Sequence, residues 1–535
     1  MKTTLSVLLF FLAALFFLDS CSQVVPPVGG KKDTLAPVLT ESLPINRQKN
    51  FKGQIIELTF NEDIRLDNPN QKIIITPQPD EIFRVKARPN SFRILFEKPL
   101  KDSTTYTLNF TDAVKDVNEG NPALNLKLVF STGNLIDSLR VRGNVVDLQT
   151  GLPVLNTLVG LYIPSDTLTP TRIKPYFFTR TDTSGNFNLE NIRSGTYRVF
   201  AFDDKNLNLL YNPGVERVAF LRDSLVVNRN VDTLKFELFP YYNTPPRVSR
   251  TEQRASSYTL VFDRGLTDYR TQFANPADSL PSFLRTPSEL TFFNTSSSTD
   301  TIRVQINALD SLGNTATLNQ GIRFRQASRQ EKPVALEARV QPGTGDDIER
   351  NAKFVIQFSK PVARTTPDSI RLFTDSLTLV PLAAENFVWS NSRTQLTITK
   401  STPARQSIRF MLGKGAFISI QNDSTAAARY QYALRNPENY GVLFGQINTT
   451  EPKFIVELLN ENFKVVDRQF NTPTYRFTYV KPGKYRLRVI LDKNGNGKWD
   501  SGNLPERQLP EPIIHYPTVI PLKQNFEYSQ DINTL

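Results

Sequence analysis

Short stretches in which apolar and polar residues alternate recur along most of the chain. Clear examples are QIIELTF, TYTLNFT, YTLVFD, TIRVQIN, KFVIQFS and KYRLRVIL, which lie between Pro, Gly, Asn and Asp residues. Alternation with a period of two, bounded by turn residues, is typical of half-buried β-strands. Many short strands at this spacing are typical of β-sandwiches. The pattern therefore predicts an all-β chain, organised as a tandem array of β-sandwich modules.

One type of module combines a strand ending in Phe with a later Asp…Gly-Asn turn. Phe60 ends the strand in the first copy, and Phe358 takes its place in a later copy. The turn residues are Asp116, Gly120 and Asn121, and a second such turn has Asp310, Gly313 and Asn314. We expect the Asp to accept backbone N–H groups and the Gly-Asn pair to take positive φ. These residues are predicted to be structural.

This type of module resembles the bacterial Ig-like domain of the SbsA type. The resemblance rests on the Phe-containing strand and on the Asp…Gly-Asn hairpin that closes the domain. It implies a β-sandwich used for adhesion, spacing or binding, and not for catalysis. We expect such domains at residues 34–134, 245–328 and 332–436, with the middle one the most degenerate.

A second type of module carries Thr181-Asp182-x-x-Gly185-x-Phe187, followed by Gly195-x-Tyr197. This string is similar to the carboxypeptidase regulatory-like, transthyretin-type sandwich, which implies a stabilising or binding module because the enzyme's zinc ligands are absent. We predict one copy at 139–240 and a second at 438–535. The second copy lacks the first string, but SGTYRVFAFDDKNLNLLYNPG aligns without a gap to its PGKYRLRVILDKNGNGKWDSG, so Asp204 matches Asp492.

The N-terminus carries an apolar run over residues 5–18, which is shorter than the roughly 18 or more residues of a membrane span. It fits the apolar region of an export signal. The run ends in Leu18-Asp19-Ser20-Cys21, which resembles the lipobox of bacterial lipoproteins, and Cys21 is the only cysteine of the chain. We predict a signal peptide at 1–20, lipidation of Cys21, and a flexible Pro/Gly tether at 21–33 that resembles those of Bacteroidetes lipoproteins.

The chain has 535 residues and a net charge of +12, but its positive residues do not gather into one patch. In stretches such as YRLRV they alternate with apolar residues, which predicts solvated strand faces. A nucleic-acid-binding protein would show clustered Lys and Arg with interleaved aromatics. We therefore expect no nucleic-acid partner, and a lipid bilayer contacted through the acylated Cys21.

Catalytic motifs are scarce in this sequence. The single histidine, His515, lies in an apolar stretch bounded by prolines and is predicted to be an ordinary packed strand residue. The sequence has no G-x-S-x-G elbow, no phosphate-binding Gly loop and no H-E-x-x-H. A pair of carboxylates, as glycosidases use, stays open, because one sequence does not show which acids meet.

The stretch DKNGNGKWDSGN places oxygen-bearing side chains at the spacing of an EF-hand calcium loop. The predicted ligands are Asp492, Asn494, Asn496, the Lys498 carbonyl, Asp500 and Asn503. Asn503 replaces the bidentate Glu, so a bound Ca²⁺ should be weak, with a Kd of roughly 10⁻⁴–10⁻³ M. No other cofactor is expected. The alternative is an Asn/Gly-rich turn whose side chains bond their own backbone.

The first copy of this loop keeps only part of the ligand set. Its predicted ligands are Asp204, Asn206, Asn208 and Asn212. Leu207 and Leu209 replace the two glycines of the other copy, and Asn212 replaces Asp500. The first loop is therefore expected to bind calcium more weakly than the second.

A further pattern is Asp-Ser-Leu, which occurs five times. It resembles the O-glycosylation sequon of Bacteroidetes, and it is equally what a turn leading into a strand looks like. The copies begin at Asp137, Asp223, Asp278, Asp310 and Asp375.

The sequence as a whole predicts a non-catalytic cell-envelope lipoprotein. We expect a monomeric scaffold or binding protein at the outer membrane, on either its periplasmic or its surface face, with a protein or glycan partner. One alternative is a glycan- or surface-binding adhesin. Another is an envelope hydrolase with an unrecognised carboxylate pair.

Overall fold

The computed structural model describes residues 33–79, 83–123, 125–165, 169–242, 244–295, 300–326, 335–374 and 378–534. The predicted signal peptide, Cys21 and nearly all of the predicted tether lie outside these ranges. Within them, none of the helices has the length and apolar character needed to span a membrane.

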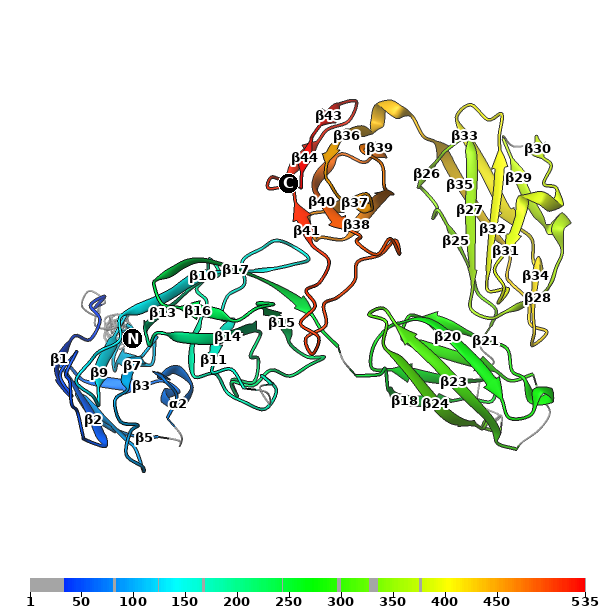
Figure 1. Ribbon diagram of the computed structural model, residues 1–535. Helices are drawn as coiled ribbons and strands as arrows, with labels where there is room; N and C mark the ends of the chain where they lie inside the picture. The colour runs from blue at the N-terminus through cyan, green and yellow to red at the C-terminus, as the bar shows by residue number, and fades with distance from the viewer. Residues whose placement is uncertain are drawn as a thin grey trace, which may run out of the picture.

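The prediction of an all-β chain is confirmed (Figure 1). Strands dominate the described residues, and they form the antiparallel and mixed sheets of successive sandwich modules. The helical segments are single turns: α2 (Pro69–Lys72), η1 (Pro276–Asp278), η2 (Pro367–Ser369), η3 (Ala384–Asn386) and η4 (Pro437–Asn439).

The first module packs a four-stranded sheet, ordered β1-β2-β6-β5, against a three-stranded sheet, ordered β4-β7-β9. A short β3-β8 ladder lies beside them. The strands of this module are β1 (Leu39–Leu43), β2 (Ile55–Phe60), β3 (Ile64–Leu66), β4 (Ile74–Thr76), β5 (Arg84–Arg88), β6 (Ser91–Leu95), β7 (Thr105–Asn109), β8 (Val114–Asp116) and β9 (Lys127–Ser131). The alternating apolar residues of these strands, including Phe60, fill the space between the sheets.

The second module is a single path of strands, ordered β12-β11-β14-β15-β17-β10-β13, with β16 beside β14. Its strands are β10 (Leu139–Asp147), β11 (Leu158–Tyr162), β12 (Phe177–Arg180), β13 (Asn186–Ile192), β14 (Gly195–Phe202), β15 (Arg217–Phe220), β16 (Leu225–Val227) and β17 (Val231–Pro240). Phe187 and Tyr197, the aromatics of the sequence motif, are both buried in its core.

The third module has sheets ordered β18-β19-β22-β21 and β20-β23-β24. Its strands are β18 (Val248–Gln253), β19 (Ser257–Phe262), β20 (Leu266–Phe273), β21 (Ser282–Thr286), β22 (Glu289–Phe293), β23 (Ile302–Asp310) and β24 (Thr315–Ile322). The strand order of its first sheet matches that of β1-β2-β6-β5 in the first module: two hairpins lie side by side, joined through β19 and β22.

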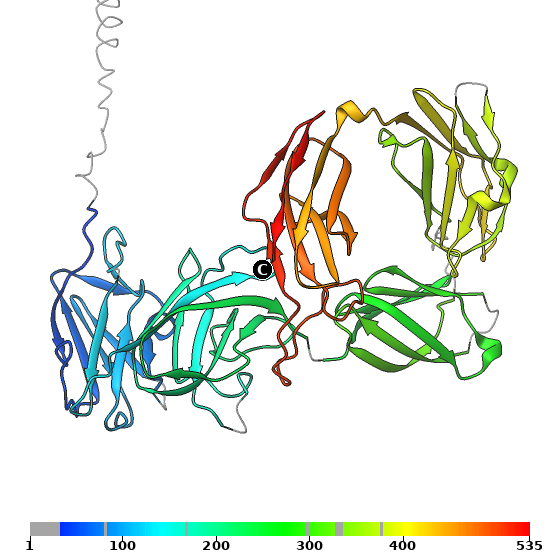
Figure 2. The ribbon, with the colours of Figure 1, turned by 45° about the horizontal axis from the view of Figure 1, so that its top comes forward.

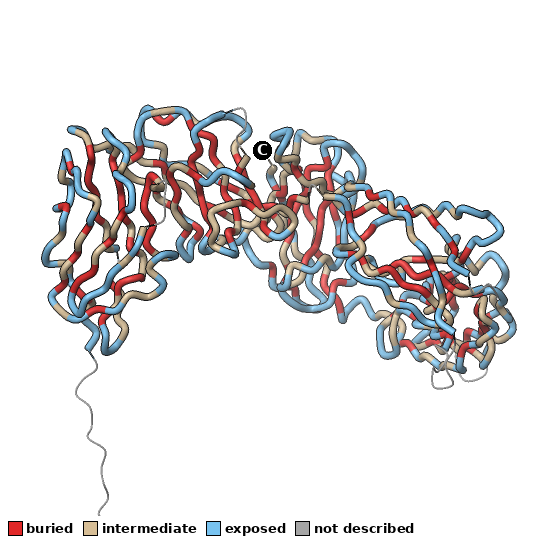
Figure 3. Tube along the Cα trace, turned by 90° about the horizontal axis from the view of Figure 1, so that it is seen from below, coloured by how far each residue is buried: buried red, intermediate tan, exposed pale blue. Residues whose placement is uncertain are grey.

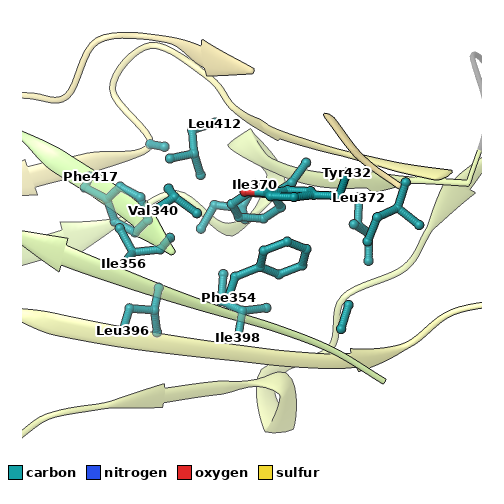
Figure 4. Close-up of a cluster of buried hydrophobic side chains, with 14 of the residues drawn as sticks. Val340, Phe354, Ile356, Ile370, Leu372, Leu396, Ile398, Leu412, Phe417 and Tyr432 are labelled. Atoms are coloured by element: carbon teal, nitrogen blue, oxygen red, sulfur yellow. The ribbon is translucent and has the colours of Figure 1, made fainter. Parts of the chain in front are cut away.

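The fourth module has sheets ordered β25-β27-β32-β31 and β26-β35-β33-β29-β30, with a separate β28-β34 ladder. Its core stacks Phe354 on Phe410 with ring centroids 4.4 Å apart, and Figure 4 shows Phe354 among the aliphatic side chains around it. The strands are β25 (Ala338–Gln341), β26 (Asp347–Ile348), β27 (Asn351–Phe358), β28 (Val362–Thr365), β29 (Ile370–Phe373), β30 (Leu379–Val380), β31 (Phe387–Trp389), β32 (Gln395–Ser401), β33 (Ser407–Leu412), β34 (Phe417–Ser419) and β35 (Ala428–Leu434).

The fifth module has sheets ordered β39-β36-β43 and β38-β37-β40-β41, with β44 beside β36 and β42 beside β40. Its strands are β36 (Gly441–Asn448), β37 (Phe454–Asn460), β38 (Val465–Phe470), β39 (Thr474–Val480), β40 (Gly483–Leu491), β41 (Ile513–His515), β42 (Ile520–Leu522), β43 (Glu527–Ser529) and β44 (Ile532–Asn533).

The second and fifth modules share one strand arrangement. The first strand of each, β10 or β36, lies between an antiparallel partner and a parallel one. Both first strands contain a glycine at the same close approach: a Cβ on Gly143 would lie 2.1 Å from the Leu234 carbonyl oxygen, and one on Gly445 would lie 1.9 Å from that of Gln530. No larger residue fits there without moving the neighbouring strand.

The Asp…Gly-Asn turns behave largely as the sequence predicts. Asp116 accepts from the backbone N–H groups of three turn residues at 2.7–3.1 Å, and Asp310 accepts from two at 2.9 Å. Gly120 and Gly313 take φ of +80° and +85°. The expectation is wrong for the asparagines, which are not among the positive-φ residues. In each turn only the glycine takes a left-handed φ, and the asparagine after it does not.

The modules do not form a linear string. The first and second lie side by side, the third and fourth extend away from them, and the fifth returns to lie against the second (Figures 1 and 2). Figure 3 shows buried segments running through each module and continuing across the contact between the second and fifth. Modules that are far apart in sequence are therefore packed together.

Candidate functional site

The two Asp/Asn loops leave equivalent positions, at the ends of the central strands β14 and β40. In the second copy, Asp492 is 3% exposed and accepts from the backbone N–H groups of Asn496 and Gly497 at 3.0 and 2.9 Å. In the first copy, Asp204 accepts from those of Asn208 and Leu209 at 3.0 and 3.3 Å. The turn function that the sequence suggested is therefore present in both copies.

The asparagines continue this pattern. Asn494 and Asn496 each accept from a backbone N–H two residues later, at 3.0 Å. Their side-chain amides both donate to Asp500. The structure thus brings Asp492, Asn494, Asn496 and Asp500 into one bonded group, and Lys498 joins it through its backbone N–H. Asn503 is not part of that group, because its side chain accepts from the Glu506 N–H at 3.3 Å.

The first loop differs from the second because an arginine pairs with its aspartate. Arg180, at the end of β12, donates from Nη2 to Asp204 Oδ2 at 2.6 Å, and the Asp204 side chain is 0% exposed in this pair. No ion pair to Asp492 occurs among the residues that the structure describes. The buried carboxylate of the first loop is therefore neutralised by a guanidinium, and that of the second loop is held by N–H groups alone.

Each loop is closed by a glutamate that the sequence did not single out. Glu216 accepts from the Lys205 and Asn212 N–H groups at 3.0 and 2.9 Å. Glu511 accepts from those of Lys493 and Asp500 at 2.8 and 3.0 Å. Burial raises the pKa of Glu511, and the charge of Asp500 adds to that effect. The two glutamates stand at different distances along the chain from their aspartates, so a gap-free alignment does not match them.

From the second half of its Asp/Asn loop to Glu511 the fifth module extends outward and rests on the second module (Figure 2). Ser501 donates to the Pro240 carbonyl oxygen at 2.9 Å. A Cβ on Gly502 would lie 2.9 Å from the Phe239 ring. We name this contact between the second and fifth modules the central joint. Trp499 packs against its apolar cluster. The buried members of that cluster include Leu148, Phe239, Tyr241, Ile455, Ile490 and Ile513.

Polar bonds fix the central joint. Arg488 is 8% exposed, donates to Glu457 at 2.6–2.7 Å, and reaches the Gln149 carbonyl oxygen of the second module at 2.6 Å. The prediction of a solvated strand face is therefore wrong for Arg488, because a distant module covers it. His515 lies in the same contact, with Nε2 2.9 Å from the Leu148 carbonyl oxygen. Burial lowers the pKa of His515.

Neighbouring modules are joined as well. Asn191 donates to Thr107 Oγ1 at 2.9 Å between the first and second modules. Gln421 donates to the Ser256 carbonyl oxygen at 2.7 Å between the third and fourth. Tyr440 donates to Asp347 Oδ2 at 2.8 Å between the fourth and fifth. The described modules therefore meet through specific side-chain contacts.

The described residues contain no group of three or more His, Cys, Asp or Glu side chains placed to hold a metal ion. Calcium at the second loop would need amide and carbonyl oxygens besides Asp492 and Asp500, as weak oxygen sites use. It stays a prediction. The Asp-Ser-Leu serines at 138, 224, 279 and 311 are all exposed, whereas the copy at 375–377 lies outside the described residues.

A half-open cleft of about 1490 Å³ separates the first and second modules. It is lined by aliphatic and aromatic residues and by a few charged ones, and residues 207–210 of the first Asp/Asn loop form part of its wall. Of the described lining residues, Glu97 is the only carboxylate, and it pairs with Arg84. The cleft thus does not present the acid pair that a glycosidase uses.

Residues 33–132 match the family model described as "Bacterial Ig-like domain". This confirms the Ig-like resemblance for that part of the chain. No curated protein matches the chain.

Several solved structures are similar to the chain at low sequence identity. Surface layer protein SbsC, domains 1–6, is 13% identical over 92% of this chain and 68% of its own, with a TM-score of 0.15. Dimeric latent PorU from Porphyromonas gingivalis is 11% identical over 56% of this chain and 36% of its own, with a TM-score of 0.22. A Bacteroides ovatus SGBP-B, in complex with a mixed-linkage heptasaccharide, is 9% identical over 72% and 91%, with a TM-score of 0.16.

Proposed function

We propose that the chain is a non-catalytic scaffold or binding protein of the bacterial cell envelope, held at the outer membrane by acyl chains on Cys21. Its modules would be of the SbsA Ig-like and transthyretin types that their sequences resemble, in a lipoprotein of Bacteroidetes type. Its partner would be a protein or glycan of the envelope.

The central joint carries the scaffold proposal. A flexible string of modules needs contacts only between sequence neighbours, and inter-domain contacts within a chain are often small and mobile. Here the fifth module returns to the second and buries Arg488, Glu457 and an apolar cluster there. Such packing holds non-adjacent modules at fixed positions, which suits a rigid spacer or platform.

Rigidity is tested with spin labels at two exposed positions outside the apolar cluster of the central joint. Cysteines replace Leu135 and Leu379, which are 73% and 53% exposed, in a chain that also carries Cys21→Ala. Pulsed electron resonance should give one narrow distance distribution between the two labels. A broad distribution that stays unchanged when the joint is disrupted by Arg488→Ala would refute the rigid scaffold.

The membrane anchor is tested by fractionating cells. The wild-type chain should sediment with membranes and incorporate labelled palmitate, whereas Cys21→Ala should incorporate none. Ser20→Ala is the matched control, because it keeps a small residue before the cysteine and should stay in the membrane. Equal incorporation of palmitate by Cys21→Ala and the wild type would remove the lipid anchor from the proposal.

A second candidate is a binding protein, or adhesin, that uses the cleft between the first and second modules. The observation in its favour is the size of the cleft, which exceeds the roughly 300–1,000 Å³ of ordinary small-molecule sites. The hydrolase alternative has no comparable support among the described residues.

A further inference from the structure

We propose that a shallow groove on the third module binds a neutral glycan chain. The groove has a volume of about 630 Å³ and lies on the outer face of the sheet β20-β23-β24 (Figure 1). This volume is ordinary for a small-molecule site. The site rests on the proposed role of the chain as an envelope binding protein, and it narrows the partner of that role from a protein or glycan to a glycan.

The register of the strands gathers amide side chains in one row of the groove. Gln272 of β20 lies opposite Gln305 of β23, which lies opposite Asn319 of β24, and all three line the groove. Neighbouring strands are about 4.8 Å apart, so the row spans roughly 10 Å, a length comparable with two joined sugar rings. Arg303, two residues before Gln305, adds a guanidinium on the same face because side chains alternate along a strand.

Gly321 leaves the groove open at the end of this row. It lies directly opposite Arg303, and a Cβ there would lie 3.0 Å from Thr301 Cγ2. Its φ is not in the left-handed region, so the backbone itself does not require glycine. Glycine weakens the interior of a strand and often marks a place where a ligand or another backbone approaches closely. Access to the groove therefore explains Gly321, whereas the geometry of the strand does not.

The face that carries the groove differs from an ordinary solvated edge. Edge strands commonly carry charges, lysine above all, which prevent unwanted pairing. β5, an edge strand of the first module, follows this rule with Arg84, Lys86 and Arg88. β24 is also an edge strand, and its eight residues, TATLNQGI, include no charge. Its exposed positions hold Thr, Asn and Gly, which form a polar surface without a strong field.

The mixture of donors and acceptors suits a neutral polyhydroxyl ligand. Each side-chain amide offers N–H donors and a carbonyl acceptor, and the guanidinium offers donors only. A sugar hydroxyl both donates and accepts, so a pair of adjacent hydroxyls satisfies both kinds of group. An anionic group accepts only and would leave the amide carbonyls unpaired. The described lining residues include one cation, Arg303, and no carboxylate.

The third module lacks the apolar surface that a protein or a bilayer would cover. Protein interfaces are anchored by buried apolar and aromatic side chains. Over residues 244–295 and 300–326, no large apolar residue is among the exposed ones. Gln272, Arg303 and Asn319 are exposed, so the outer face of β20-β23-β24 is open to solvent. This face can therefore hold a polar ligand without any rearrangement of the modules.

The test is an array of neutral hexasaccharides with gluco-, manno-, xylo- and galacto-configured backbones, together with a galacturonate hexamer. The full chain, carrying Cys21→Ala, is applied beside a variant that also carries Arg303→Ala and Gln305→Ala. At least one neutral hexasaccharide should retain the first chain and not the variant. Calorimetric titration of that sugar should show at least a tenfold loss of affinity in the variant and no dependence on salt, because the ligand has no charge.

Gly321→Val separates binding from folding. Valine suits a strand, and the Thr301 methyl group that it would approach ends a side chain that can turn, so the melting temperature should be unchanged or higher. Affinity for the selected sugar should fall at least fivefold, because the added side chain fills the groove. Gln357→Ala removes an exposed strand amide from the fourth module and should leave affinity unchanged.

Several outcomes would overturn the proposal. These are no neutral sugar that distinguishes the chain from the double variant, and equal affinity of the selected sugar for Gly321→Val. Binding of the galacturonate hexamer alone, lost at high salt, would assign the groove to an anionic ligand held by Arg303. A concentration-dependent dimer that excludes the sugar would assign the face to a second copy of the chain.

Failure of the glycan site is distinguishable from failure of the proposed function. Loss of sugar binding would leave the distance between the spin labels and the incorporation of palmitate as they are. Failure of the scaffold or of the anchor would change those two measurements in a chain that still binds the sugar.

Discussion

The loops at 204–216 and 492–511 share one pattern of backbone hydrogen bonds but lie in different surroundings. In both, a buried aspartate at the end of a central strand accepts the N–H groups of the turn, and a glutamate closes the far side. In the first loop Arg180 neutralises the aspartate and two leucines face a cleft. In the second, glycines replace the leucines, Asp500 joins the group, and Ser501 of the same loop bonds to another module.

The same divergence appears on the sheets from which the loops emerge. Phe200 lies opposite Gly160 in the second module, and Arg488 lies opposite Glu457 at the corresponding place in the fifth. The apolar pair belongs to a face that carries aromatic residues, and the charged pair reaches across the central joint to Gln149. The backbone bonds to the aspartate therefore maintain the loop in both modules, while the side chains that those bonds do not use have different partners in each.

The largest predicted effect is the loss of the cation from the first loop. Arg180→Ala should lower the free energy of unfolding of the second module by about 4 kcal/mol, because it leaves a fully buried carboxylate without its counter-ion. Calorimetry of the full chain measures this change. Arg140→Ala removes an exposed ion pair with Asp232 in the same module and should change stability little. Equal losses in the two variants would contradict the role given to Arg180.

The second-largest predicted effect is a loss of stability in the fifth module, at the central joint. Arg488→Ala should cost about 3 kcal/mol, somewhat less than a complete loss of pairing, because Arg468 still contacts Glu457 at 3.0 Å. Urea unfolding followed by Trp499 fluorescence, in a Trp389→Phe background, reports on the joint. Replacing Arg488 and Glu457 together by methionine should recover most of the loss. An unchanged midpoint for Arg488→Ala would show that the pair does not hold the joint.

Calcium sharpens the contrast between the loops. With a Kd of roughly 10⁻³ M, 5 mM Ca²⁺ should stabilise the second loop by about 1 kcal/mol, since binding to the folded state adds RT ln(1 + [L]/Kd). The melting temperature of the full chain, with and without Ca²⁺, tests this expectation. Asp500→Asn, which copies Asn212 of the first loop, should abolish the shift. No shift in the wild type at this concentration would leave the second loop as a turn only.

The smallest predicted effect is on the pH dependence of stability. Burial lowers the pKa of His515 below that of a free histidine, so the folded state binds the proton less readily than the unfolded state. The stabilising contribution is therefore complete above the ordinary histidine pKa, near 6.5, and is lost as the pH falls below it. His515→Gln retains a donor toward Leu148 and should reduce the difference in melting temperature between pH 7.5 and 5.5. An unchanged difference would show that His515 does not contribute to it.

The fold was largely predictable because its signals are local. Period-two alternation gave the strands, and the Asp…Gly-Asn turns were identified from adjacent residues. The prediction of positive φ for Asn121 and Asn314 was wrong, because the glycine alone takes the left-handed conformation in each turn. Glu216 and Glu511 could not be identified as partners, because their separations from the loop aspartates differ and only the folded loop shows that both bind the same N–H groups.

The sequence by itself determined the all-β architecture, the Ig-like first module and the two aspartate-led loops, since each depends on residues within a few positions of one another. Only the tertiary structure decided what those loops do. Arg180 reaches Asp204 from 24 positions away, and Arg488 reaches Gln149 from 339. A buried charge takes its partner from whatever the fold places beside it, and that neighbour is set by the packing of strands and modules. For the same reason DKNGNGKWDSGN is identifiable from sequence as a turn or a calcium loop, while its place at the central joint is not.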